Sequence, residues 1–123
     1  MGAGLSATTA NEALNAAVET YAAYVQLHTG DPGANGTNNV SSVTTREAAT
    51  WASASGGSVV TSDTQTWSDW GGDNGEIITY ISLWDMSSGG TFGGSLQLAA
   101  SETMDTGDSL ELLSITIIIP LAS

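Results

Sequence analysis

The stretch Glu76 to Asp85, EIITYISLWD, is the longest strand-length run in this 123-residue chain that is apolar on both sides. Successive side chains of a strand point to opposite faces. The apolar residues therefore divide into two sets, with Ile77, Ile81 and Leu83 on one face and Ile78, Tyr80 and Trp84 on the other. A strand with two apolar faces needs cover on both, which predicts that this stretch is the central strand of a sheet.

Turn signals recur at short intervals on both sides of this strand. The clearest is Gly30 to Asn39, GDPGANGTNN, where Pro-Gly and Asn-Gly pairs favour tight turns with positive φ. Adjacent glycines at Gly93 and Gly94 suggest a β-bulge. Further strands are expected at residues 23–29, 44–54, 58–62, 64–70, 91–99 and 110–119. Many short strands separated by turns predict a mainly β fold, an antiparallel β-sandwich or jelly-roll-like domain.

One α-helix is expected before the first strand. Thr9 and Glu12 have the spacing of a capping box, and apolar residues follow at helical intervals. The helix should span residues 9–21, after an N-terminal arm at residues 1–8. The sequence has no internal repeat and no linker, so residues 9–123 are predicted to form a single domain.

The charge balance excludes several classes of partner. The chain has 13 acidic residues against a single basic one, Arg46, and its formal net charge is −12. Phosphate backbones and anionic lipid surfaces are recognised by clusters of lysine and arginine, which this chain lacks. No run approaches the ~20 apolar residues that a membrane-spanning helix needs. Neither nucleic acid nor a membrane is therefore an expected partner.

Two sets of polar residues have side chains that could form a catalytic or a metal site. His28 lies three residues before Asp31, but the chain has one histidine and no nucleophile elbow, so we expect no catalytic residues and no enzyme activity. Asp69, Asp73 and Glu76, with Asn74, offer hard oxygen ligands in a glycine-rich turn. Their spacing does not match an EF-hand, so they are only weak calcium candidates, and no cofactor is expected.

The aromatic and cationic residues each allow two interpretations. Trp51, Trp67, Trp70 and Trp84 could form a platform for glycans, although tryptophans in a small β domain more often fill the core. Arg46 is expected to pair with a loop carboxylate.

Residues 115–119, ITIII, form an uncharged and strongly β-prone run. Such a run promotes aggregation when it lies on an open sheet edge. We therefore expect it to be interior or covered by a partner, and the protein to be stable chiefly as an oligomer or on a larger assembly.

Several short motifs together resemble a family of small virion proteins of tailed phages, often labelled tail fibre proteins. These motifs are LHTGDPG at residues 27–33, Arg46 followed by Trp51, ISLWD at residues 81–85, and Gly107-Asp108 before the last strand. The resemblance implies a β-sandwich structural protein on the outside of a particle, without enzyme activity. It also implies structural roles for the motif residues. His28 and Asp31, with Pro32 and Gly33, would fix the first loop, Arg46 would pair across to that loop, and Trp84 with Asp85 would end the central strand.

Within the virion, two roles fit this resemblance. The chain has no heptads or repeats of the kind that build a fibre stalk. This favours a decoration or minor capsid protein that binds the outer surface of the major capsid protein's shell and stabilises it. Its expected partners are that capsid protein and copies of itself, with a homotrimer plausible by analogy with threefold capsid sites. The alternative is a tail fibre or tail-associated protein that binds a host surface glycan. Either protein would be made in the host cytoplasm and carried on the outer surface of the virion.

Overall fold

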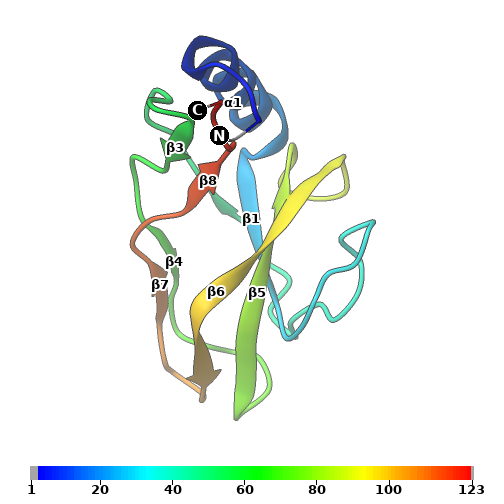
Figure 1. Cartoon of the computed structure of the whole chain (residues 1–123). Coiled ribbons are helices and arrows are strands. Elements are labelled where there is room, and N and C mark those ends of the chain that lie inside the picture. Colours follow the sequence, from blue (N-terminus) through cyan, green and yellow to red (C-terminus); the bar gives the residue numbers. More distant parts are fainter. Residues whose placement is uncertain (1–2, 123) are drawn as a thin grey trace.

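The computed structural model describes residues 3–122, so the first two residues of the predicted arm lie outside the described part (Figure 1). Along these described residues one helix and eight strands follow one another. They are α1 (Ala7–Tyr21), β1 (Tyr24–His28), β2 (Glu47–Ala48), β3 (Ser58–Val60), β4 (Gln65–Trp67), β5 (Glu76–Trp84), β6 (Phe92–Met104), β7 (Leu110–Leu112) and β8 (Thr116–Ile118).

The strands form one larger sheet and two small ladders, all antiparallel. The sheet has the order β2-β1-β5-β6, and the ladders are β3-β8 and β4-β7. In Figure 1 the ladders run alongside the sheet and α1 covers one end, where both termini lie. Buried apolar side chains from the helix, the sheet and both ladders form one hydrophobic core. The prediction of a mainly β, sandwich-like fold with one helix is confirmed.

The predicted central strand, residues 76–85, corresponds to the nine-residue strand β5, which pairs with β1 on one side and β6 on the other. The predicted assignment of its faces is wrong at one point, because Ile77 is 49% exposed whereas Ile78 is fully buried. The pairing with β6 shifts register between Ile78 and Tyr80. This irregularity brings Ile78 into the core together with Ile81 and Leu83, because a bulge reverses the alternation of side chains.

The helix begins at Ala7, two residues before the predicted start. Its N-cap is Ser6, whose hydroxyl accepts a hydrogen bond from the Thr9 N–H, so the predicted capping box at Thr9 and Glu12 does not form the cap. The preceding arm contacts the chain's C-terminal segment. Leu5 forms a bridge with Leu121, and the Ala122 N–H donates to the Leu5 carbonyl at 2.8 Å.

Two predicted long strands are broken because their hydrogen-bond partners change along the way. Of residues 44–54, only the two residues of β2 form a ladder. The next N–H groups donate in turn to the Ala23 carbonyl, the Asp63 carboxylate and the Val60 carbonyl. Likewise, residues 110–119 divide into β7, paired with β4, and β8, paired with β3. At the break, the buried Ile115 donates its N–H to the Thr61 hydroxyl at 2.9 Å.

Strand β6 is longer than predicted and carries the expected bulge. Leu83 pairs with Gly94 but Trp84 pairs with Phe92, which leaves Gly93 as the extra residue. Gly93 lies directly against the backbone of Tyr21 at the end of α1, where an added Cβ would overlap the Tyr21 carbonyl oxygen. The absence of a side chain therefore lets the helix pack on this edge of the sheet.

Candidate functional site

The first loop is held by two contacts from motif residues. The Nδ1 atom of His28 lies 2.9 Å from the Asn38 carbonyl oxygen. The Asp31 carboxylate accepts a hydrogen bond from the Gly33 N–H at 2.9 Å, while Gly33 itself has a φ of +78°. Between them, Pro32 is buried. The loop is thus fixed at both ends of the turn that the Pro-Gly pair predicted.

Behind this loop, His28, Ser82 and Trp84 form a buried hydrogen-bonded chain. The Ser82 hydroxyl lies 2.6 Å from His28 Nε2 and accepts a hydrogen bond from the Trp84 indole N–H at 2.7 Å. Because the Asn38 carbonyl can only accept, it assigns the histidine proton to Nδ1, and Nε2 then accepts a hydrogen bond from the Ser82 hydroxyl. Sequence reasoning missed Ser82. Its signal was a polar residue inside a run whose two faces are both apolar.

The pair formed by His28 and Ser82 does not have the properties of a catalytic dyad. Both side chains are fully buried, so no substrate reaches the hydroxyl. The Nδ1 atom faces a backbone carbonyl, whereas a triad places a carboxylate there. Asp31 uses its carboxylate in the loop turn instead.

Burial lowers the pKa of His28 below its ordinary value of 6.5, and the positive charge of Arg46 acts in the same direction. Hydrogen bonds to the carbonyls of Asn38 and Asn39 oppose this shift without overcoming it. The folded protein therefore holds His28 neutral at a pH where the unfolded chain would already bind a proton there.

We expect the free energy of unfolding to fall as the pH decreases below 6.5 toward the lowered pKa of His28. Above pH 6.5, the stability that depends on neutral His28 should be fully present. In the window below pH 6.5 the unfolded chain binds more protons, so the slope reaches up to about 1.4 kcal/mol per pH unit. Urea unfolding between pH 7 and about pH 5 measures it. Because the chain has one histidine, H28Q should be less stable but lack this slope. An equal slope in wild type and H28Q would refute the assignment.

Arg46 does not pair with the first loop as expected. Its guanidinium donates to the Gln26 side-chain oxygen at 3.0 Å and to the carbonyls of Met86 and Gly89 at 2.8 and 2.7 Å. The turn at residues 86–90 thus takes the place of the predicted carboxylate, because it presents backbone carbonyls to the fork of donors. Asp85 is near enough to raise the Arg46 pKa, but burial outweighs it and the net shift is downward.

Arg46 also joins Trp84 and Phe92 in a cluster that we call the stacked unit. Its guanidinium carbon lies 4.0 Å from the Trp84 ring centroid, and the Phe92 ring packs on Trp84 with centroids 5.4 Å apart. On the first loop, a Cβ at Gly36 would meet the Phe92 ring. Residues far apart in the sequence, from loop, sheet and turn, are therefore joined into one structural unit. The resemblance motifs supplied most of its members but not Phe92 or Gln26.

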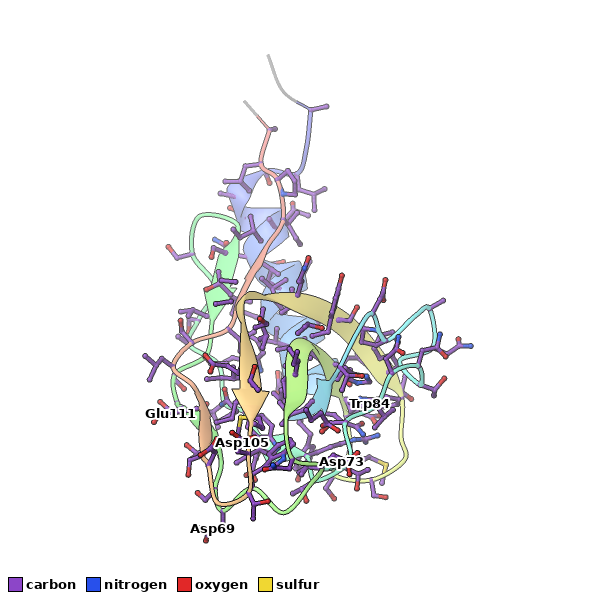
Figure 2. All side chains as sticks on the ribbon, turned by 90° about the horizontal axis from the view of Figure 1, so that it is seen from below. Asp69, Asp73, Trp84, Asp105 and Glu111 are labelled. Atoms are coloured by element: carbon purple, nitrogen blue, oxygen red, sulfur yellow. The ribbon has the colours of Figure 1, made fainter. Side chains whose placement is uncertain are left out.

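The calcium hypothesis is not supported. Glu76 accepts hydrogen bonds from the Ser41 hydroxyl and the Ser42 N–H, and Asn74 accepts one from the Thr106 N–H at 2.9 Å. Figure 2 shows Asp69 and Asp73 at separate places near the end of the molecule opposite α1. Within residues 3–122, no three His, Asp or Glu side chains come together in a way that could hold a metal ion.

The four tryptophans do not form a glycan platform. Trp67, Trp70 and Trp84 are between 2% and 7% exposed, and Trp51 is half-buried. Each indole N–H is used inside the protein, with partners Ala22, Thr45, Asp73 and Ser82. Three of the four therefore fill the core. Trp51 lines an open cavity of about 370 Å³ between α1 and residues 49–52, and the edges of Trp67 and Trp70 line another of about 360 Å³ beside residues 42–45.

A further open site lies between β6 and the segment that carries β7 and β8. It is a cavity of about 220 Å³ with Ile81 from β5 among its lining residues. Residues 96–99 form one wall, and Leu112, Ser114, Ile115 and Thr116 form the other. A separate cavity of about 160 Å³ lies nearer α1, beside Leu83 and Ile117. We refer to these two cavities together as the edge groove. None of its lining residues is charged.

Within residues 3–122, no helix is long and apolar enough to cross a membrane. A search of curated proteins found no match to this sequence. Residues 4–119, however, match the family described as Podophage GP4 fiber I protein gp80. The match covers the helix, all eight strands and the stacked unit around Trp84. The chain therefore belongs to the family of the podophage fibre I protein gp80, a family of virion structural proteins.

Proposed function

We propose that this chain is a non-enzymatic structural protein of the phage tail, exposed on the outer surface of the virion and assembled with copies of itself. The observation that carries the proposal is the family match over residues 4–119, because the family is described by a fibre protein. The high acidic charge agrees with an outer position, since packaged DNA would repel such a chain.

The absence of catalysis is part of the proposal and is supported by the buried pair of His28 and Ser82. A nucleophile must reach its substrate, and a hydroxyl beneath the first loop does not. The hydrogen bonds around this pair connect the loop to β5 and Trp84. They therefore serve to hold the stacked unit in place.

Copy number in the virion distinguishes the tail role from decoration of the capsid. A tail component should be present in a few to a few dozen copies, because a phage has one tail, whereas a decoration protein covers a shell of many subunits. Quantitative mass spectrometry of purified virions, with the major capsid protein as the internal reference, gives the number. Hundreds of copies would refute the tail role and support capsid decoration.

Recognition of a host surface glycan is a second candidate function, favoured by the cavity beside Trp51. Glu19 and Thr50 line this cavity together with the indole ring, which gives polar groups beside an aromatic surface. A glycan array with wild type and W51A tests it. Saturable binding that is lost in W51A would support recognition, and no binding by the wild type would exclude it.

A further inference from the structure

Two unpaired strand edges border the edge groove. Strand β6 is the outer strand of the four-stranded sheet, and among the strands of residues 3–122 β8 pairs with β3 alone. Each therefore presents backbone N–H and C=O groups along its other edge. At 13 residues, β6 is also the longest strand of the fold. Long open edges are templates for pairing with another extended segment.

The usual protection of such edges is missing here. Natural edge strands carry lysine, proline or inward-pointing charges that prevent pairing. Residues 92–101 of β6 have neither charge nor proline, and residues 112–119 on the opposite wall have neither as well. In this segment Leu113 is 74% exposed and Ile118 is 68% exposed, and neither side chain lines the groove itself. The fold of the single chain therefore leaves most of both apolar side chains in contact with solvent.

Charge identifies the occupant of this groove. A basic partner would be drawn to the end of the molecule opposite α1, over which Asp69, Asp73, Asp105 and Glu111 are spread (Figure 2). A second copy of this chain, which also has a net charge of −12, is repelled from nearly every charged surface. The uncharged edge groove is a place where two copies can approach without that repulsion.

We propose that the segment Leu113 to Ile118 of a second copy docks along the free edge of β6 at the edge groove. The backbone edge of this segment pairs with that of β6, and its exposed apolar side chains become buried at the contact. Each copy carries both halves of the interface. Two copies can therefore dock on each other reciprocally, or successive copies can dock one after another to form a longer assembly. This inference rests on the self-assembly included in the proposed function, and it names the surface.

Sedimentation velocity of the full chain, over a range of concentrations, tests the proposal with two alanine-to-glutamate variants. Ala99 is exposed on β6 and lines the groove, whereas Ala16 is exposed on α1 outside it, so A99E and A16E add the same charge at different places. We expect A99E to weaken self-association by about tenfold or more, because it places a charge in the apolar contact, and I118S to do the same, because it removes buried apolar surface. We expect A16E to associate like the wild type.

Hydrogen exchange locates the contact. We expect the backbone amides of residues 93–99 and 113–118 to exchange more slowly when the copies associate. The proposal is overturned if wild type stays monomeric up to its solubility limit, if A99E and I118S associate as tightly as A16E, or if protection appears elsewhere. Circular dichroism of each variant confirms that the fold is kept. The copy number in the virion is measured independently, so a tail protein that assembles through another surface would be recognised as such.

Discussion

Replacing Trp84 by alanine should lower the free energy of unfolding by about 3–5 kcal/mol, the range for removing a large buried aromatic side chain. Trp84 is 7% exposed and packs against both the Arg46 guanidinium and the Phe92 ring. Its indole N–H is also a partner of the buried Ser82 hydroxyl. The substitution therefore opens a cavity and leaves a buried polar group with one partner fewer.

Urea denaturation of W84A measures this loss, and I77A in the same strand is the matched control. Ile77 is 49% exposed, so its truncation should cost under about 1 kcal/mol. A similar small loss in both variants would mean that the stack around Trp84 does not stabilise the fold.

Replacing Gly93 by alanine should destabilise the protein by about 3 kcal/mol, at the upper end of the range for overpacking. The new Cβ would overlap the Tyr21 carbonyl oxygen and lie 2.9 Å from the carbonyl carbon. Both atoms belong to the backbone and cannot rotate away as a side chain would. The end of α1 must therefore move off β6, which disturbs the core contacts of Val18 and Ala22.

The control for G93A is G71A, because Gly71 also lacks a positive φ and its Cβ would come no closer than 3.9 Å to the Asp69 carbonyl oxygen. Thermal unfolding of the two variants gives the comparison, and hydrogen exchange along α1 tests the cause. If G93A and G71A had the same melting temperature, and α1 of G93A kept its protection from hydrogen exchange, the close approach of helix and strand would not matter for stability.

Local patterns in the sequence predicted the parts of this fold that depend on near neighbours. The two-sided apolar run at residues 76–85 indicated the inner strand β5, and Pro-Gly and Asn-Gly pairs located the first loop. The glycine pair at Gly93 indicated the bulge. Turn chemistry and strand alternation act over a few residues, so the sequence displays them directly.

The sequence identified several residues of the site but not the partners that they contact. His28, Arg46 and Trp84 were singled out, but their partners Ser82, Gln26 and the carbonyls of Met86 and Gly89 were not. Backbone carbonyls are present at every residue, so no sequence pattern marks the ones that a guanidinium will reach. The same reason explains why Arg46 was assigned to a carboxylate.

The amino-acid sequence by itself determined the fold class, the inner strand, the first turn and the lack of cationic surface. Tertiary structure alone decided where strands end. Residues 44–54 and 110–119 change their hydrogen-bonded neighbours along their length, and the strand pairing is interrupted where the neighbour changes. It also decided that Ile78 rather than Ile77 enters the core, and that three of the four tryptophans are buried. Pairing partners and burial are properties of distant contacts, and a strand's own residues do not specify which neighbour it will meet.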